Sequence, residues 1–238
     1  MKILIVGASK GLGKAFVEGL PDANDTIIGV SRNKPNDLQL KNNVFVDWIE
    51  VDMADPIKAA DIIETQSPAE LDVIIYNLGI WEEHAFTGNY RYLHSSDEET
   101  VNLVQVNITS AIILLKRMLP RLLNSARPQI VLTGSTSGLP QSGQPEVAFG
   151  ASKFALRGIA DALREGFREQ RLAVTCLQLG DLNTDDGISE PLAKACQKSG
   201  GRFIPVHDVV SITRTLLSLS TCSFVKEIVL PAIHDERF

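Results

Sequence analysis

The sequence predicts an α/β fold in which one parallel, doubly wound sheet lies between two layers of helices. Two observations lead to this prediction. Short apolar runs rich in β-branched residues recur along the chain, and amphipathic stretches separate them. Parallel neighbouring strands need crossover connections, which cover both faces of a sheet. The chain has 238 residues, of which 44% are apolar and 22% charged, so we expect one domain from 1 to 238.

The expected strands are short and bounded by polar residues or glycine. They are Ile3–Val6, Thr26–Val30, Val73–Tyr76, Ile130–Thr133 and Ala173–Leu177. The expected helices are Gly11–Gly19, a segment that begins at Asp55 and Pro56, a long one from about Glu98 to Leu123, and one from about Phe149 to Gln170. The Asp55 carboxylate can cap free backbone amides, and Pro56 occupies the first helical position, where an N–H is not needed.

Three segments interrupt this alternation. Between Ser31 and Val44 there is room for little more than a short helix. The polar connection from Trp81 to Asp97 is longer than ordinary loops of a sheet, so we expect it to be functional or mobile. From Asp181 to about residue 203, glycines surround a short helical pattern, and we predict a lid there.

The overall charge argues against several classes of partner. A formal net charge of −6 and a pI near 5.3 give no general attraction to nucleic acid or anionic membranes. No apolar run approaches the roughly 18 residues of a membrane span. The three cysteines are far apart and lack the close pairing of a zinc site. We therefore expect reduced thiols, a cytoplasmic location and a small-molecule partner.

A glycine-rich turn follows the first predicted strand and opens the first predicted helix. Its residues are Gly7, Ala8, Ser9, Lys10, Gly11, Leu12 and Gly13. Glycines at such a turn let a pyrophosphate approach the backbone, and the positive end of the following helix favours its charge. The turn predicts a dinucleotide site on a Rossmann-type, three-layer domain. An ordinary strand-to-helix turn is the alternative.

The glycine spacing G-x-x-x-G-x-G and the residues downstream resemble the short-chain dehydrogenase/reductase family from Lys2 to about Thr184. In the strand numbering of that family, the matching positions are Asp52 with Met53 after the third strand, Asn77-Leu78-Gly79 after the fourth, Asn107 in the long helix, Ser135 after the fifth strand, and Gly180 with Thr184 after the sixth. Tyr76, Leu78 and Leu179 depart from the family pattern. By this resemblance, these glycine-turn and downstream residues would bind a nicotinamide dinucleotide, with Asp52 near the adenine.

The end of the second strand favours NADP(H) over NAD(H). Members that use NAD usually carry an acidic residue there, which would repel a 2′-phosphate. This chain has Ser31 and Arg32 instead, with Lys10 nearby in the glycine turn. A guanidinium fork suits a phosphate. The alternative is that Arg32 and Lys10 are ordinary surface charges.

By the same resemblance, four positions form the active site. Asn107 would hold a water molecule, Ser135 would hydrogen-bond the substrate oxygen, and Lys153 would hold the cofactor. The fourth position, four residues before Lys153, is a proton-exchanging tyrosine in the family and Phe149 here. Phe149 has no proton to give. Because a positioned acid or base typically contributes about 10²–10⁴ in rate, we expect slow turnover rather than none.

Four explanations for Phe149 are open. The chain can be an engineered variant in which a tyrosine was replaced to trap a complex. Another group can deliver the proton instead, either a bound water or a side chain of the long connection: Tyr90, Tyr92 or His84. The protein can use the cofactor only for structure or sensing. Finally, the reaction can take its proton from solvent.

Other residues have structural as well as functional interpretations. Ser135 and Asn107 can also cap a turn or a helix. The spacing of His84, His94 and His207 indicates no metal site. Apolar residues that can line a substrate pocket, or simply pack the core, are Trp81, Phe86, Leu139, Pro140 and Val147.

The leading hypothesis is an NADP(H)-dependent oxidoreductase acting on a carbonyl or alcohol, with a lid on the substrate side. A non-catalytic NADP(H)-binding regulatory protein is the alternative. A dehydratase or epimerase of the longer-chain relatives is less favoured, because the C-terminal part is short for a separate substrate domain. The two long helices resemble those that pair in family dimers and tetramers. The sequence does not identify the substrate.

Overall fold

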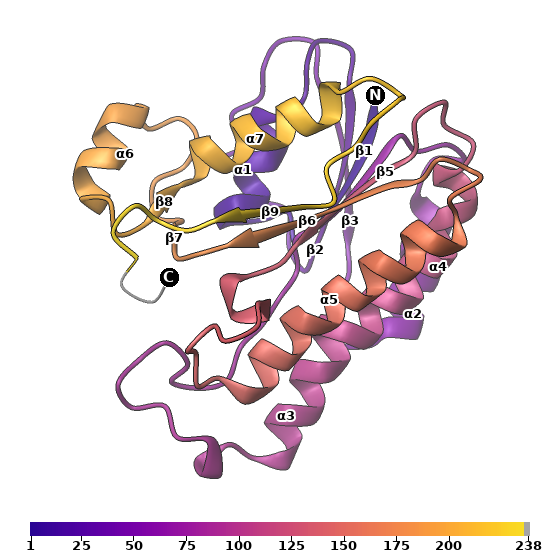
Figure 1. The fold of residues 1–238 in the computed structure, drawn as a ribbon. Coiled ribbons are helices and arrows are strands. Elements are labelled where there is room, and N and C mark those ends of the chain that lie inside the picture. Colours follow the sequence, from indigo (N-terminus) through magenta and orange to yellow (C-terminus); the bar gives the residue numbers. More distant parts are fainter. Residues whose placement is uncertain (236–238) are drawn as a thin grey trace.

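Short buried strands and longer helices alternate along the chain, and Figure 1 shows their arrangement in the computed structural model, which describes residues 1–235. The strands are β1 (Lys2–Val6), β2 (Thr26–Ser31), β3 (Phe45–Glu50), β4 (Val73–Tyr76), β5 (Gln129–Thr133), β6 (Ala173–Leu179), β7 (Leu182–Asn183), β8 (Ile204–Pro205) and β9 (Glu227–Leu230). The α-helices are α1 (Gly11–Gly19), α2 (Pro56–Gln66), α3 (Asp97–Val104), α4 (Ser110–Leu122), α5 (Val147–Gly166), α6 (Leu192–Ser199) and α7 (Val206–Ser218).

Seven parallel strands form the central sheet in the order β3-β2-β1-β4-β5-β6-β9. From β1 the chain first adds strands on one side and then crosses to β4 on the other side. The sheet order therefore reverses between β1 and β4, and ligands of open α/β sheets bind at the carboxyl ends of the strands beside such a point. The glycine turn follows β1 and Asn77 follows β4, so both lie at this place.

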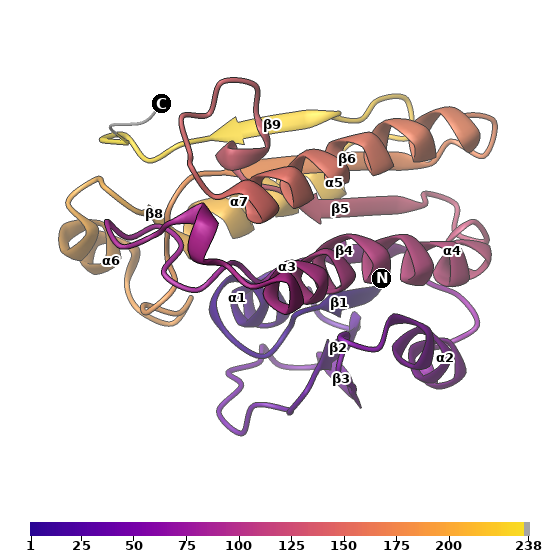
Figure 2. The ribbon, with the colours of Figure 1, turned by 90° about the horizontal axis from the view of Figure 1, so that it is seen from below.

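Helices cover both faces of the sheet, as Figures 1 and 2 show. α1 packs with α7 on one face, and α2 packs with α4 on the other, beside α5. The side chains of successive β1 residues point to opposite faces of the sheet. Leu4 and Val6 join the core under α2, α4 and α5, whereas Ile3 and Ile5 join the core under α1 and α7. A strand buried on both faces is continuously apolar, which is why β1 is detectable in the sequence.

The predicted class and the single domain are confirmed, and several element bounds change. β3 and β9 were not among the expected strands, and no helix forms in the described chain between Ser31 and Val44. α5 begins at Val147, two residues before its expected start, and ends at Gly166 rather than Gln170. As predicted, Asp55 caps α2 by accepting a hydrogen bond from the Lys58 amide at 3.2 Å.

The long helix is continuous from Asp97 to Leu122 but contains a π-helical turn, Gln105–Thr109. By length and composition alone this helix could cross a membrane. Half of its most apolar window is nevertheless buried in the fold, as expected for a helix that covers a sheet. The π turn holds Asn107, and such turns occur frequently at functional sites.

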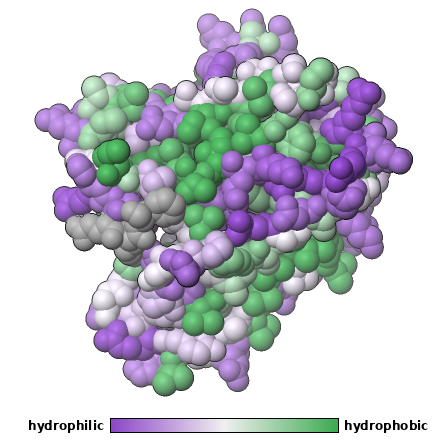
Figure 3. Space-filling view, viewed as in Figure 1, coloured by the Kyte–Doolittle hydropathy of each residue, from purple (hydrophilic) through white to green (hydrophobic). Residues whose placement is uncertain are grey.

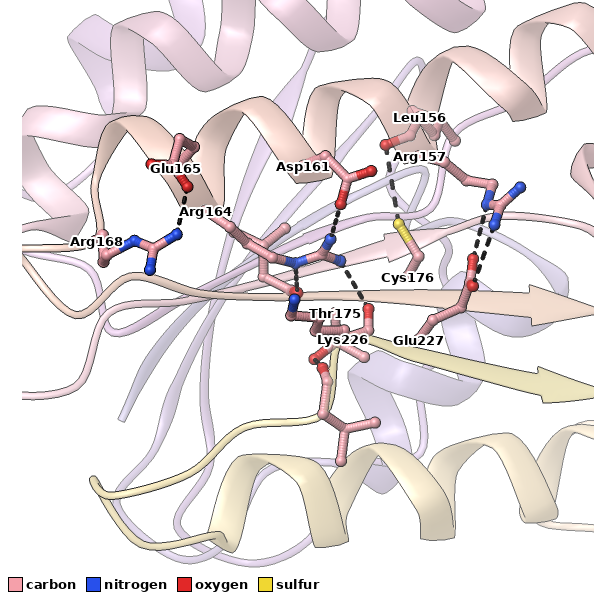
Figure 4. Close-up of polar contacts among 12 residues, drawn as sticks. Leu156, Arg157, Asp161, Arg164, Glu165, Arg168, Thr175, Cys176, Lys226 and Glu227 are labelled. Atoms are coloured by element: carbon pink, nitrogen blue, oxygen red, sulfur yellow. Dashed lines mark hydrogen bonds and ion pairs between the residues drawn. The ribbon is translucent and has the colours of Figure 1, made fainter.

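Arginines of α5 fasten the C-terminal strand to the rest of the sheet, as Figure 4 shows. The Arg157 Nε donates to the Glu227 carboxylate at 2.9 Å, and Arg164 donates to the carbonyls of Val174 and Lys226 at 2.9 and 2.7 Å. In the space-filling view, a band of hydrophilic side chains crosses this face with apolar areas on either side of it (Figure 3). The charged links therefore hold β9, a half-buried edge strand, in place.

Candidate active site

The glycine turn is shaped to bring a ligand close to the backbone. Gly7 and Gly11 have positive φ values of 79° and 52°, which L side chains rarely adopt. A Cβ on Gly13 would lie 1.9 Å from the Gly7 carbonyl oxygen. Lys10 is the N-cap of α1, and its side chain does not cap the helix. The first amides of α1 are thus available to an anion, which fits the pyrophosphate of a dinucleotide.

Several residues predicted to bind the cofactor lie beside this turn. The Asn77 side chain donates to the Gly7 carbonyl at 3.4 Å, and Thr184 is next to Gly11. Leu12 of α1 is buried in the core between that helix and the sheet, and Leu78 packs against the core on the other face of the sheet. Ser9 is half-buried within the turn, and Gly180 follows β6 beside Pro231.

Arg32 follows β2, and Lys10 lies in the glycine turn, which is linked to β2 by the hydrogen bond from the Ala8 amide to the Val30 carbonyl. Arg32 and Lys10 are exposed, and within the described residues neither side chain has a hydrogen bond or ion pair. The Ser31 hydroxyl is engaged, because it donates to the Asn33 carbonyl at 2.8 Å and accepts from Trp48 at 3.1 Å. Glu50 is the β3 partner of Ser31, so a negative charge also lies near this end of the strand.

The residues expected at the adenine follow β3. Asp52 is exposed, and its carboxylate accepts a hydrogen bond from the Ala54 amide at 3.0 Å. Met53 is buried in the core with α2 and α4. Asp52 therefore lies at the same edge of the sheet as the glycine turn, with its side chain in solvent.

Lys153 is buried on α5 and lies next to Phe149. Its ammonium donates to the Thr133 carbonyl at 3.0 Å and lies 5.4 Å from the centroid of the Phe149 ring. A Cβ on Gly79 would lie 3.2 Å from the Lys153 Nζ and 3.9 Å from the Asn107 Oδ1. Burial lowers the pKa of Lys153 to about 8. Gly79, Asn107, Phe149 and Lys153 thus share one small region.

Both ends of the Asn107 amide are engaged. Its oxygen accepts from the Ile80 amide at 2.8 Å, and its nitrogen donates to the Ile80 carbonyl at 2.7 Å and to the Ser152 hydroxyl at 3.0 Å. Ser152 in turn donates to the Phe149 carbonyl at 2.7 Å. Asn107 therefore joins the chain after β4 to the helix that carries Phe149 and Lys153.

Ser135 lies directly after β5 and is held through its backbone. Its hydroxyl accepts from the Ser137 amide at 3.1 Å, and its own amide donates to the buried Gln178 side chain at 3.1 Å. Gln178 also donates to Glu227 at 2.7 Å. Hydrogen bonds from Gln178 and Arg157 lower the pKa of Glu227 although burial opposes them. The Gln178–Glu227 pair was not found from sequence, because no local pattern signals it.

Phe149 belongs to a cluster of three rings that includes Trp81 and Phe86 of the long connection. Tyr90, one of the alternative proton donors, is buried, and burial raises the pKa of its hydroxyl. Tyr92 and His84 are exposed. The structure therefore gathers Asn107, Phe149 and Lys153 with these rings, and it places Tyr92 and His84 at the surface.

The predicted lid segment forms elements of its own, a short β7–β8 pair and α6. Asp186 pairs with Lys198 at 2.5 Å, and the His207 Nε2 contacts the Ile188 and Glu190 carbonyls at 3.1 and 2.8 Å. A cavity of about 490 Å³ lies between this segment and the chain after β9. Among the described residues no group of three possible metal ligands occurs.

Comparison with known proteins agrees with this geometry. A family model described as short chain dehydrogenase matches residues 1–195. A 3-ketodihydrosphingosine reductase of Bacteroides thetaiotaomicron is 29% identical over 188 residues, which cover 76% of this chain and 64% of that protein. An NADPH-dependent pterin aldehyde reductase of Arabidopsis thaliana is 26% identical over 190 residues, with 77% and 75% covered.

Solved structures share the fold at low sequence identity. A 3-oxoacyl-[acyl-carrier protein] reductase with bound NAD from Brucella melitensis superposes with a TM-score of 0.78 at 19% identity, covering 98% of this chain and 90% of that one. An alcohol dehydrogenase from Thermococcus sibiricus complexed with 5-hydroxy-NADP gives 0.77 at 19% identity, covering 99% and 97%. Since the family model covers most of the sequence, this chain belongs to the short chain dehydrogenase family of oxidoreductases.

Proposed function

We propose that the protein is an NADP(H)-dependent oxidoreductase that interconverts a carbonyl compound and an alcohol. The observation that carries this proposal is that the glycine turn after β1 and the Lys153 side chain lie along the same edge of the sheet, the one formed by the carboxyl ends of its strands. Gly79 lies between the two, close to Asn77 in sequence and to the Lys153 ammonium in space. One bound dinucleotide can therefore contact both the turn and the lysine, and when bound it would supply or accept a hydride.

The preference for NADP(H) rests on Arg32 and Lys10. Both cations are exposed and unpaired within the described residues. A 2′-phosphate could therefore bind both of them without breaking an existing ion pair. Glu50 acts in the opposite direction, because a carboxylate disfavours a second anion. We expect the two cations to outweigh it, since a guanidinium can bind a phosphate with two hydrogen bonds.

A titration of the purified protein tests this preference. NADPH should bind at least about tenfold more tightly than NADH, which corresponds to about 1.4 kcal/mol. Arg32→Gln should remove most of the difference by weakening NADPH alone. Arg168→Gln, which alters an exposed arginine paired with Glu165 on α5, is the matched control and should change neither affinity. Equal or tighter NADH binding by the unaltered chain would refute the preference.

The proposed roles of the active-site residues follow from their contacts. Ser135 would orient the substrate oxygen, and Lys153 would hold the ribose of the cofactor while its charge favours a developing alkoxide. Asn107 would position the chain before Trp81 and a water molecule beside Lys153. Phe149, in the place of the proton-exchanging tyrosine, contributes no proton, so we propose that the proton comes from water at this position.

Tyr90 is the weaker candidate for the proton donor. Its hydroxyl donates to the Glu82 carboxylate at 3.5 Å and accepts from the Val147 amide at 3.2 Å. A donor already bound on both sides must break a contact to reach a substrate. Oxidation of NADPH in the presence of a panel of aldehydes and ketones tests turnover. Tight NADPH binding without any turnover would favour the non-catalytic alternative.

We further propose a cytoplasmic homo-oligomer with a substrate-side lid at about 181–203. The three cysteines are free thiols, as a reducing compartment requires. Large apolar side chains are exposed on α3, α4 and α5: Val101, Val104, Ile112 and Phe154. An apolar face on these two long helical elements suits pairing with a second copy.

A further inference from the structure

Trp81 is an exposed side chain whose backbone is held on both sides. Before it, Ile80 exchanges two hydrogen bonds with the Asn107 amide. After it, the Glu82 carboxylate accepts from the Ala148 and Phe149 amides at 2.8 and 3.2 Å. The Trp81 side chain is 58% exposed, yet these bonds fix the position from which it projects. A fixed aromatic ring with a free face is suited to bind a ligand.

The three rings form one contiguous wall. The Phe86 centroid lies 6.0 Å from that of Trp81 and 5.1 Å from that of Phe149, and the Trp81 and Phe149 centroids are 6.5 Å apart. All three pairs meet edge to face, the arrangement that aromatic rings prefer. Since Phe149 also lies 5.4 Å from the Lys153 ammonium, this aromatic wall stands beside the position where the reaction is proposed to occur.

Two buried carboxylates fasten the aromatic wall in a reciprocal way. Glu82 of the long connection binds amides at the start of α5, and Glu146, just before α5, accepts from the Phe86 amide at 2.8 Å. Their residues are only 2% and 3% exposed. The second oxygen of each is buried without a hydrogen-bond partner in the described structure.

We call the two buried carboxylates, Glu82 and Glu146, with the amides that they bind, the Glu82–Glu146 clasp. Its hydrogen bonds stabilise the fold, whereas the burial of its charges destabilises the fold. Burying a charged group costs free energy unless hydrogen bonds satisfy it, and here each carboxylate is only half satisfied. The positive N-terminal end of α5 stabilises the negative charge of Glu82. It does not supply a hydrogen-bond partner for the second oxygen of either carboxylate. A connection that needed only to close between β4 and α3 would not require such groups. The clasp is explained if the placement of the rings matters for binding.

We propose that Trp81, Phe86 and Phe149 bind the apolar part of the substrate, and that this part is a flat or aromatic group next to the reacting carbon. The inference rests on the proposed function for the position of that carbon. The wall offers ring faces and edges, while the nearby carboxylates are turned to backbone amides. Apart from the indole N–H of Trp81, the three rings carry no hydrogen-bonding group, so a flat apolar group would be desolvated against the wall.

Binding of two methyl ketones tests the proposal without requiring turnover. Calorimetric titration compares 2-acetonaphthone with 2-butanone, using the protein alone and saturated with NADP⁺, which has no hydride to give. The unaltered chain should bind the naphthyl ketone at least about tenfold more tightly. Trp81→Ala and Phe86→Ala should each lose most of this difference. Tyr92→Ala, an exposed aromatic of the same connection without a ring contact in the described structure, should keep it.

A second pair of variants tests the clasp. Glu82→Ala removes the oxygen that accepts from both the Ala148 and the Phe149 amides, so it should reduce the ketone preference without abolishing NADP⁺ binding. Glu83→Ala, at an exposed neighbour, should leave the preference unchanged. Thermal unfolding of each variant separates a displaced wall from a misfolded chain.

The outcomes distinguish this inference from the proposed function. Equal affinity for the two ketones, or a preference that survives Trp81→Ala and Phe86→Ala, would overturn the aromatic wall. A preserved binding preference with no NADPH oxidation by any carbonyl would instead overturn the proposed function and leave the wall standing.

Discussion

Burial strongly changes the protonation of Lys153, which is the site residue whose pKa is most displaced at the scale of single residues. Burial lowers its pKa from the ordinary 10.5 to about 8, so between these values the unfolded chain binds more protons than the folded chain. The free energy of unfolding contributed by this position must then rise with pH across that interval. From pH 7.5 to 10, the chain should gain about 2–3 kcal/mol relative to Lys153→Met, measured by urea unfolding. A difference that does not depend on pH would show that the ammonium is not desolvated.

Gly13 is the residue with the least room for a side chain. Alanine there would place a Cβ 1.9 Å from the Gly7 carbonyl oxygen, so the turn must open. Gly13→Ala should weaken NADPH binding by at least about tenfold and lower the melting temperature. Gly158→Ala is the control, because nothing lies within 4 Å of its Cβ, and a mid-helix alanine should stabilise α5 by about 0.5–1 kcal/mol. Unchanged NADPH affinity in Gly13→Ala would contradict the proposed cradle.

At the scale of elements, Gln178 of β6 links Ser135 to the edge strand β9. Gln178→Met would leave the Ser135 amide and the Glu227 carboxylate each without one partner. We expect a loss of about 1–3 kcal/mol in the free energy of unfolding and a fall in kcat/KM for any carbonyl substrate. Gln66→Met, at the exposed end of α2, should do neither. If both variants behave alike, Gln178 does not position Ser135.

The elements differ in how visible they are in the sequence. β1 from Ile3 onward and β4 are fully buried and continuously hydrophobic, because helices cover both of their faces. β3 and β9 are half-buried edge strands with few buried residues, so their composition resembles that of loops. α5 begins at Val147 because Glu82 and Tyr90, far away in sequence, bind its first amides, and no local pattern contains that information.

The residues of the candidate site also differ in how well the sequence predicts them. The glycine turn was predicted from its place between a strand and a helix, whereas Asn107, Ser135 and Lys153 were predicted because they match motifs of the family that the sequence resembles. The Glu82–Glu146 clasp and Gln178 were not predicted. Glutamate is rarely buried, so the default expectation for both carboxylates is solvent, and only the assembled fold brings amides to them. The cofactor preference and the individual site roles stay predictions.

For the whole molecule, the exposed apolar side chains of the long helices predict self-association. The protein should sediment as a dimer or tetramer at micromolar concentration. Ile112→Glu together with Phe154→Glu should yield monomers, because two charges would be buried in the interface. Ile57→Glu, at an exposed apolar position on α2, should leave the assembly unchanged. A monomer for the unaltered chain would contradict the proposed use of this face.

The proposed reaction is tested most directly by following deuterium from NADPH labelled at C4 of the nicotinamide into the product alcohol. With 2-acetonaphthone as substrate, mass spectrometry should find one deuterium on the carbinol carbon, formed slowly by the unaltered chain. Phe149→Tyr should form the same product about 10²–10⁴ times faster, because it restores a positioned proton donor. Absence of deuterium in the product of both proteins, each with NADPH bound, would contradict hydride transfer at this site.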